Sequence, residues 1–347
     1  VLSAGSVVDL ALAARARAIL HGYLGGEAGA GAMAELLYGD ANPSGKLAES
    51  YPLALSDTPA YPYRKLRGNC AEYRESIYVG YRYYDKAKVP LRYPFGFGLS
   101  YTRFAYEDLR LSEAGVRFRL RNTGSRAGAE IAELYICAAE SETFRPEKEL
   151  KGFAKVFLKA GEEREVFIPF DDKSFRVFDS VANRFLEESG RYRILIGASA
   201  ADIRLNGELV RAGEKLGRPD EKKRLPHYFS GAAQQIGRAE FERLLGRKLE
   251  RHPIAGELLR GDALHELRRS RGLLARLLYR QLRRALNRSA ARREPDLNLI
   301  FAYHMPFRAF SKFGSGKISP GMTEGLLMML NGHLFGGFRK FVIESIK

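Results

Sequence analysis

Two glycine-containing stretches have spacings that could do chemistry, because both approach phosphate-binding patterns. Residues 29–34 read GAGAMA and superficially fit a dinucleotide fingerprint, while residues 314–317 read GSGK, as in a phosphate loop. The first pattern needs its glycines in the turn before a helix, and here they fall inside a predicted helix. In the second, Ser311 and Ile318 replace a glycine and the magnesium-binding hydroxyl. We therefore predict no nucleotide site and no cofactor.

The histidines and cysteines do not have the spacing of a metal or redox site. The six histidines are scattered, with no pair at metal-ligand spacing. Cys70 and Cys137 lie far apart in the sequence and match no metal or redox motif. We predict no metal site and interpret both cysteines as small buried apolar residues.

One acidic residue could contact a ligand. Glu27 stands in a glycine-rich turn, and a carboxylate in the first turn of a helix is stabilised by the helix macrodipole. For Glu27 we favour this structural role over substrate contact.

The net charge of +16 is concentrated in the last third of the chain. Residues 215–347 hold 27 Lys and Arg against 12 Asp and Glu, whereas residues 1–214 hold 30 against 29. This asymmetry predicts a boundary near Arg218 and Pro219. Apolar residues at 45% and charged residues at 28%, with no apolar run near the ~20 residues of a membrane span, predict a soluble multidomain protein.

Residues 1–105 alternate short apolar stretches with helical ones, which predicts part of an α/β layer. Residues 27–38 form the clearest helix, and Gly39 is placed to end it. Residues 77–84 are rich in β-branched and aromatic types and predict a strand. The chain opens on VLSAGS, which reads as a buried strand without an initiator methionine, so we expect it to begin inside a domain.

From about residue 106 to residue 210 the hydrophobic period is two. Val116, Phe118 and Leu120 alternate with arginines, and turn signals such as NTG at residues 122–124 separate the runs. About a hundred residues of short, punctuated strands predict an immunoglobulin-like β-sandwich.

Residues 225–347 have a helical period, with a long basic run over residues 266–293. Its apolar positions are Leu274, Leu277, Leu278, Leu282 and Leu286. A basic amphipathic helix can lie on an anionic membrane or neutralise nucleic-acid phosphates. We favour a helix that packs its leucines on its own protein and leaves its arginines in water, and we expect neither membrane nor nucleic acid as a partner.

Four motifs carry a resemblance to a known family. Residues 93–104 read YPFGFGLSYTRF, and they follow GGEAG at 25–29, GDANPSGK at 39–46 and VGYRYYD at 79–85. In this order and spacing they resemble the C-terminal half of glycoside hydrolase family 3, the β-glucosidase and β-xylosidase group.

Later motifs extend the resemblance. KELKGF at residues 148–153 and ESGRY at 188–192 are similar to the fibronectin type III-like domain of many members, with Phe185 in place of a usual tryptophan. LPHYFSG at 225–231 and the stretch 322–331 resemble a helical extension of some bacterial members.

The resemblance implies a multidomain fold. Residues 1–105 would form a partial α/β sandwich, residues 106–213 an immunoglobulin-like, fibronectin type III-like β-sandwich, and residues 214–347 a basic α-helical extension. It also implies that Glu75, Tyr78, Arg82 and Tyr83 lie near the interface with a barrel, with Ser76 in place of a usual glycine. We favour packing of this group on the barrel over sugar contact.

The implied reaction is retaining hydrolysis of terminal β-linked glucose or xylose, which needs two carboxyl groups ~5 Å apart across the sugar. In the family these lie in an N-terminal barrel and upstream of the strand that ends at Leu2. We therefore assign no catalytic residue, leave substrate-binding residues unassigned, and expect the chain alone to be inactive. Expected partners are the barrel, the upstream part of the sandwich domain and a β-glucoside or β-xyloside, in the cytoplasm. The alternative is a non-catalytic module that binds glycan or, through the basic tail, an anionic surface.

Overall fold

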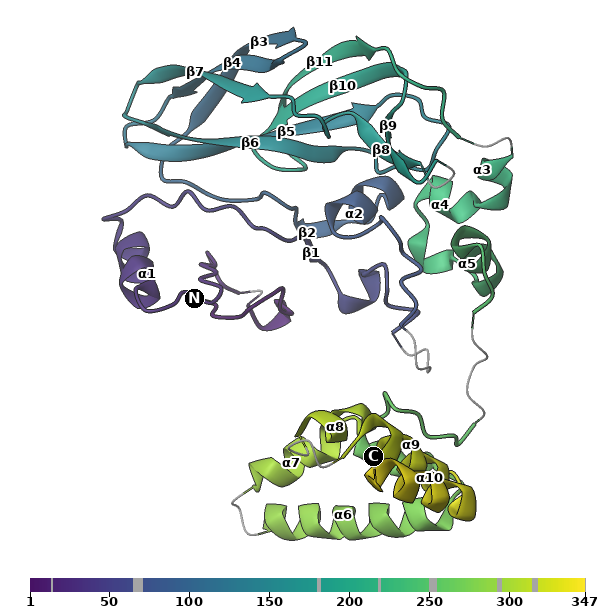
Figure 1. Cartoon of the computed structure of the whole chain (residues 1–347). Coiled ribbons are helices and arrows are strands. Elements are labelled where there is room, and N and C mark those ends of the chain that lie inside the picture. The colour runs from purple at the N-terminus through teal and green to yellow at the C-terminus, as the bar shows by residue number, and fades with distance from the viewer. Residues whose placement is uncertain are drawn as a thin grey trace. The chain divides into compact units, whose positions relative to one another are not determined.

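The computed structural model describes residues 1–13, 15–64, 71–179, 182–217, 220–249, 255–291, 295–313 and 318–346. The chain divides into two compact units (Figure 1). The first comprises residues 1–64 and 73–247, and the second comprises residues 65–72 and 248–347. Cys70, the proposed boundary at Arg218 and Pro219, the GSGK stretch at 314–317 and the end of the basic run lie outside the described residues.

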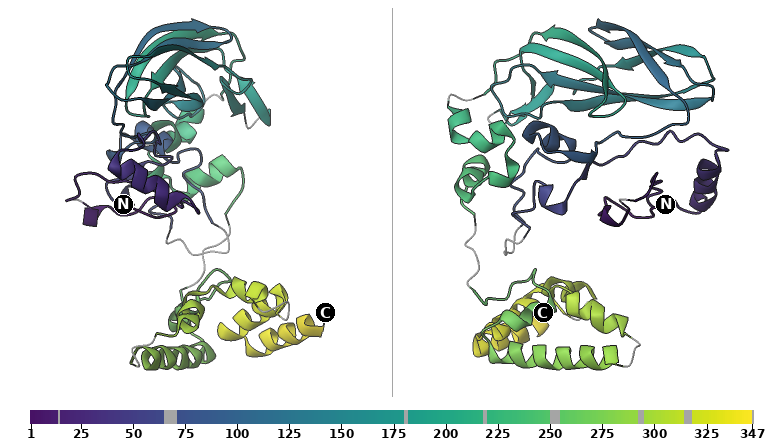
Figure 2. Two further views of the ribbon diagram at one scale, coloured as in Figure 1. Left: turned by 90° about the vertical axis from the view of Figure 1, so that its left-hand side faces the viewer. Right: turned by 180° about the vertical axis from the view of Figure 1, so that it is seen from behind.

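The middle of the first unit is a sandwich of two antiparallel sheets, seen as separate layers in Figure 2. One sheet has the strand order β11-β10-β5-β6 and the other β3-β4-β7, and a separate hairpin pairs β8 with β9. The strands are β3 (Phe104–Ser112), β4 (Gly115–Asn122), β5 (Gly128–Ala138), β6 (Glu149–Leu158), β7 (Glu163–Pro169), β8 (Arg176–Asp179), β9 (Arg184–Glu187), β10 (Gly190–Gly197) and β11 (Ile203–Arg211). This confirms the predicted β-sandwich.

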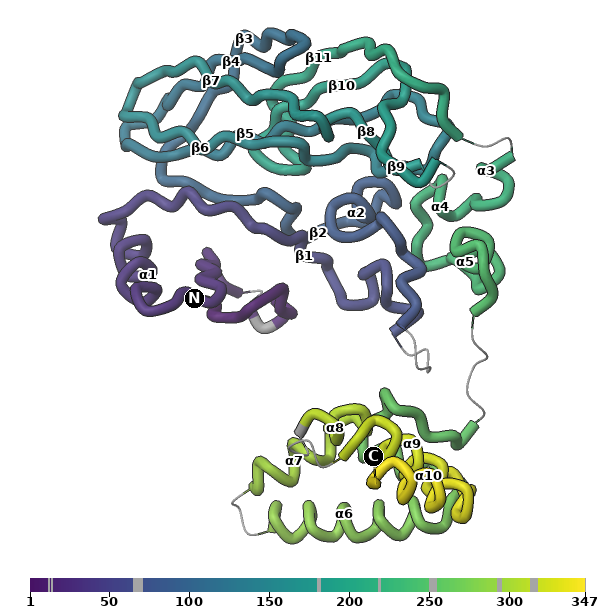
Figure 3. Tube along the Cα trace, viewed as in Figure 1, coloured from purple at the N-terminus to yellow at the C-terminus, as the bar shows by residue number. Residues whose placement is uncertain are grey.

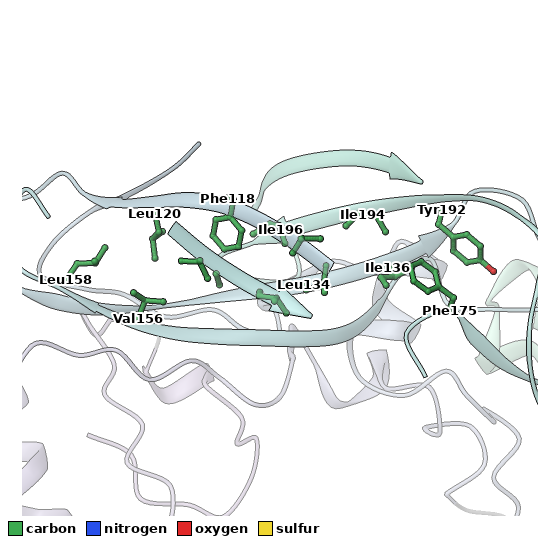
Figure 4. Packing of buried hydrophobic residues seen from close by; sticks show 14 residues of the cluster. Phe118, Leu120, Leu134, Ile136, Val156, Leu158, Phe175, Tyr192, Ile194 and Ile196 are labelled. Carbon is green, nitrogen blue, oxygen red and sulfur yellow. The ribbon is translucent and has the colours of Figure 1, made fainter. Parts of the chain in front are cut away.

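The core of the sandwich follows from the period of two. Val116, Phe118 and Leu120 point inward from β4 and are almost fully buried, while the arginines between them remain largely exposed. They meet the inward residues of β5 and β10, including Leu134 and Ile194, in one contiguous cluster (Figure 4). The predicted alternation is confirmed.

The first hundred residues contain little regular structure beside two helices. The elements are η1 (Ala11–Ala13), α1 (Gly29–Tyr38), β1 (Tyr51–Pro52), η2 (Leu55–Asp57), α2 (Tyr81–Ala87) and β2 (Leu91–Tyr93). β1 pairs with β2, and Leu2 makes a single parallel bridge with His21. The predicted buried strand at the start of the chain is therefore reduced to one bridge, and Val1 is exposed.

The predicted helix at residues 27–38 is confirmed as α1, and Gly39 ends it in the left-handed conformation, with φ of 84°. Glu27 precedes the N-cap residue Ala28, so its predicted position in the first helical turn is wrong. No residue of α1 is buried, and Leu37 and Tyr38 on it are largely exposed.

The predicted strand at residues 77–84 is wrong. Gly80 has a φ of 53° and stands at the N-cap of α2. Its positive dihedral breaks the extended backbone, and Tyr81 and Tyr84 then fall on one buried helix face. The aromatic content that suggested a strand reflects burial on both sides of a short helix.

Short helices after the sandwich belong to the first unit. They are α3 (Glu221–Arg224), α4 (Pro226–Ser230), η3 (Ala233–Gln235) and α5 (Arg238–Leu245). Of these helices, α4 lies beside α2 (Figure 3), and Gly231, which ends α4, packs against Lys86 of α2. The division between the compact units falls after these helices, and the boundary at 213/214 between sandwich and extension stays a prediction.

The second unit is helical. It contains η4 (Leu264–Arg269), α6 (Leu273–Ala291), α7 (Leu297–His304), η5 (Phe307–Ala309), α8 (Phe310–Phe313), α9 (Pro320–Leu330) and α10 (Leu334–Ile346). Its small core includes Leu258, Leu267, Ala275, Phe307 and Leu327. Within the described residues, no helix is long and apolar enough to cross a membrane.

Candidate functional site

The tyrosine-rich segment around Tyr78 is held between the sandwich and helix α4. The Tyr78 side chain is fully buried, and its hydroxyl donates to the backbone carbonyls of Tyr228 and Arg145. The Tyr228 hydroxyl in turn donates to the carbonyl of Arg74 at 2.9 Å. Burial raises the pKa of both tyrosines, so both stay protonated donors.

The next turn of this segment binds the sandwich directly. The hydroxyl of Tyr81 accepts a hydrogen bond from the backbone N–H of Leu150 at 2.7 Å. Asp85 and Lys148 form an ion pair of 2.6 Å, both largely buried. Burial raises the pKa of Asp85, against the opposing effect of Lys148. These contacts fix α2 on the β6 end of the sandwich.

Glu75 and Arg82, two of the predicted residues, carry polar atoms without a hydrogen-bond partner. Glu75 is only 7% exposed, and its Oε2 is buried and unpaired among the described residues. The same is true of Nε of Arg82. Tyr83 is buried beside Tyr84, with ring centroids 5.2 Å apart. Because buried polar groups are nearly always satisfied by protein or by ordered water, these two atoms have hydrogen-bonding capacity that the described residues leave unused.

Ser76 has a backbone conformation that favours glycine. Its φ is 51°, in the left-handed region that costs an L-residue with a side chain roughly 1 kcal/mol. Its neighbours Glu75 and Tyr78 are buried, so the backbone cannot relax into another conformation.

We expect Ser76→Gly to stabilise the first unit by about 1 kcal/mol, because glycine adopts this dihedral without strain. Chemical denaturation followed by the near-UV circular dichroism of the tyrosines measures the change. Ser56→Gly, at an ordinary negative dihedral, is the control and should not stabilise. An unchanged or lowered midpoint for Ser76→Gly would show that the residue is not strained.

The glycine motif at residues 93–104 covers a buried carboxylate on β5. A Cβ at Gly96, whose φ is 79°, would come within 2.5 Å of Oε1 of Glu133. Glu133 is buried and accepts a hydrogen bond from the Tyr135 hydroxyl at 2.6 Å. Burial raises the pKa of Glu133, and Tyr135 and Lys46 oppose this rise. Gly98 is packed as tightly, because a Cβ at this position would lie 2.6 Å from the carbonyl oxygen of Gly45.

Lys46 of the GDANPSGK motif neutralises a second buried acid. Its Nζ lies 2.8 Å from Oε1 of Glu130 and donates to the carbonyl of Ala198 at 3.0 Å. The family motifs thus bind to one another and to β5. Sequence reasoning missed the role of Lys46, because Glu130 and Ala198 are more than 80 residues away from it in the chain. Glu130 and Glu133 are both buried beneath the motifs.

A polar cluster near the start of the chain was also missed. His21 stacks on Tyr23 with ring centroids 3.8 Å apart, and its Nδ1 lies 2.6 Å from the hydroxyl of Tyr51. Burial raises the pKa of Tyr51 to about 12. The buried hydroxyls of Tyr23 and Ser50 have no hydrogen-bond partner among the described residues. These two hydroxyls and helix α1, which has no buried residue, show that residues 1–51 are incompletely packed.

The other residues that the sequence singled out lie in elements of secondary structure. The GAGAMA stretch lies within α1, as predicted. Cys137 is buried and free, with its sulfur 3.3 Å from a guanidinium nitrogen of Arg193. Phe185 packs edge-on against Phe178 in the β8–β9 hairpin and is largely exposed. Among the described residues, no group of three or more His, Cys, Asp or Glu could hold a metal ion.

Two family models match the chain. Residues 1–101 match the glycosyl hydrolase family 3 C-terminal domain, and residues 130–200 match the fibronectin type III-like domain. Thermostable β-glucosidase B of Acetivibrio thermocellus is 42% identical over 224 residues, which cover 62% of this chain and 30% of the relative. Probable β-glucosidase K of Emericella nidulans is 46% identical over 193 residues, covering 55% of this chain and 23% of that protein.

Solved structures agree with these matches. The family 3 β-glucosidase of Bifidobacterium adolescentis has a TM-score of 0.59 at 36% identity, covering 62% of this chain and 33% of that one. β-Glucosidase of Kluyveromyces marxianus, solved in complex with glucose, has a TM-score of 0.57 at 34% identity, covering 60% and 26%. The chain thus spans about a third or less of these relatives, which include fungal proteins. Residues 1–101 thus resemble the C-terminal domain of glycoside hydrolase family 3, and residues 130–200 resemble a fibronectin type III-like domain.

Proposed function

We propose that this chain is the C-terminal portion of a retaining β-glucosidase-type enzyme, in which it braces the part that carries the catalytic carboxylates. The substrate would be a terminal β-linked glucose or xylose, and the chain alone would not turn it over. The proposal is supported by the relatives, which are named β-glucosidases. A cytoplasmic location remains a prediction.

The observation that carries the proposal is a contrast in packing between two parts of the first unit, the sandwich and the hundred residues that precede it. The sandwich core is closed, with Phe118, Leu134 and Ile194 at 1% exposure or less. The preceding hundred residues instead leave α1 without a buried side chain and leave polar atoms of Tyr23 and Glu75 unsatisfied. Such a surface fits a segment that packs against further protein, which the family's barrel and the upstream sandwich would supply.

A graft tests this role. The chain is joined in place of the matching C-terminal stretch of the Acetivibrio thermocellus β-glucosidase B, and hydrolysis of an aryl β-glucoside and an aryl β-xyloside is measured. We expect the graft to be active and the chain alone to be inactive. Arg82→Ala should lower the activity of the graft about tenfold, because it removes a polar group from the docking face.

Arg103→Ala is the matched control, since Arg103 is exposed on the sandwich side of the family motif. Hydrolysis of either substrate by the isolated chain would contradict the proposal that the catalytic carboxylates lie in another part of the enzyme. An inactive but folded graft would contradict the bracing role, as would an Arg82→Ala graft that keeps full activity and stability.

A glycan-binding module is the second candidate. Phe153 and Phe157 lie on one face of the edge strand β6 and are more than half exposed, as aromatic sugar platforms require. Binding of cellohexaose by the isolated chain, combined with an inactive graft, would favour this candidate.

A further inference from the structure

Helix α10 of the second unit presents an apolar face that no described residue of the same unit covers. One side of α10 packs on α9 so closely that Gly325 and Gly337 face each other, with a would-be Cβ of Gly337 2.6 Å from the carbonyl of Gly325. The opposite side carries Phe335, Phe338 and Val342 at helical spacing. Phe335 is 93% exposed and Phe338 is 62% exposed.

The first turns of α6 present apolar side chains in the same way. Ala275 is fully buried on the inner face of the helix, but Leu273 is 77% exposed and Leu277 is 54% exposed. At 100° per residue both lie nearly opposite Ala275. The prediction that the leucines of this helix pack on their own protein therefore fails for its first turns, while Leu282 and Leu286 further along are partly buried.

These two apolar patches lie at one end of the unit. Gly272, just before α6, packs directly on the carbonyl of Leu330, to which the hydroxyl of Ser270 also donates at 2.9 Å. Leu330 ends α9, and α10 begins at Leu334. The first turns of α6 and α10 consequently lie close together, as both Figure 1 and Figure 2 show. We call Leu273, Leu277, Phe335 and Phe338 the apolar end of the second unit.

Beyond the apolar end, α6 becomes strongly basic. It contains no Asp or Glu, and Arg280, Arg283, Arg284 and Arg288 are exposed. None of these four arginines has an ion-pair partner among the residues that the structure describes. Residues 248–347 together hold 19 Lys and Arg against 8 Asp and Glu. The surface therefore suits an anionic partner that also accepts apolar side chains.

We propose that the apolar end and the arginines of α6 form a peripheral binding site for an anionic lipid bilayer. Phe335, Phe338 and the leucines would enter the interface between headgroups and acyl chains, and the arginines would contact the lipid phosphates. A nucleic acid would use the arginines but would leave the exposed leucines and phenylalanines in water. A second copy of the chain would bring together two surfaces of the same positive charge.

Co-sedimentation of the full chain with vesicles tests the proposal. The vesicles are phosphatidylcholine alone or phosphatidylcholine with about one third phosphatidylglycerol, in about 0.05 M and about 0.5 M NaCl. We expect binding only to the anionic vesicles, and weaker binding at high salt. Phe335→Ser with Phe338→Ser should weaken it at least about tenfold, and Arg280→Gln with Arg284→Gln about ten- to thirtyfold.

Two control variants keep the test specific. Phe153→Ser removes an exposed phenylalanine from the sandwich, and Arg103→Gln with Arg121→Gln removes the same charge from exposed sandwich positions. Both should bind as the parent chain does, and circular dichroism should show every variant folded.

Four binding results would overturn the proposal. They are absence of binding, equal binding to neutral and anionic vesicles, equal loss in the control variants, and binding to duplex DNA alone that survives loss of the phenylalanines. A dimer in solution that Phe335→Ser dissociates would also overturn it and assign the apolar end to a second copy. None of these outcomes bears on the proposed glycosidase role, which concerns the first unit.

Discussion

Gly96→Ala is expected to destabilise the first unit by about 3 kcal/mol. Two costs add. The φ of 79° disfavours any side chain by roughly 1 kcal/mol, and the new Cβ would meet both carboxylate oxygens of Glu133. Glu133 cannot move aside cheaply, because it is buried and bound to the Tyr135 hydroxyl.

Gly161→Ala provides the matched control. Gly161 has a similar φ of 75°, but nothing lies within 4 Å of its would-be Cβ. It should therefore show the dihedral cost alone, about 1 kcal/mol. Denaturation followed by near-UV circular dichroism measures both variants. If Gly96→Ala cost no more than Gly161→Ala, the packing of the glycine motif on Glu133 would not constrain the fold.

Lys46→Met is expected to cost about 3 to 5 kcal/mol near neutral pH. The substitution removes the cation that lies 2.8 Å from Glu130, and both side chains are largely buried. A buried carboxylate then remains without its charge partner, which is far more costly than losing a surface pair. Lys88→Met is the control, because the pair of Lys88 with Glu147 is exposed and should be worth less than about 1 kcal/mol.

The cost of Lys46→Met should shrink as the pH falls. Burial raises the pKa of Glu133 above its ordinary value of 4.5, so its favourable contribution is complete at acid pH and is lost as the pH rises through the folded-state pKa. Lys46 opposes that rise, and its removal moves the folded-state pKa further up. The difference in unfolding free energy between Lys46→Met and the parent should therefore be smaller at about pH 5 than at about pH 7. A difference that stays constant or grows on acidification would contradict this electrostatic account.

Patterns within one element were predictable because they depend on local geometry. The period of two placed Val116, Phe118 and Leu120 in the core of a sandwich, and all three are buried there. The helix ending at Gly39 was equally local, since a left-handed glycine terminates it. The strand expected at residues 77–84 was wrong because aromatic side chains are compatible with a strand or a buried helix. The positive φ of Gly80 interrupts the extended backbone there, and helix α2 begins at Tyr81.

The sequence by itself determined the family resemblance, the β-sandwich and the concentration of positive charge in the last third, because each is a property of residue order. Only the tertiary structure decided what the polar and glycine residues of the motifs touch. It paired Lys46 with Glu130, set Gly96 on Glu133, left Glu75 and Arg82 with unsatisfied atoms and left the first leucines of α6 exposed. The physical reason is that burial and charge pairing depend on distances between segments far apart in the chain, which periodicity does not encode.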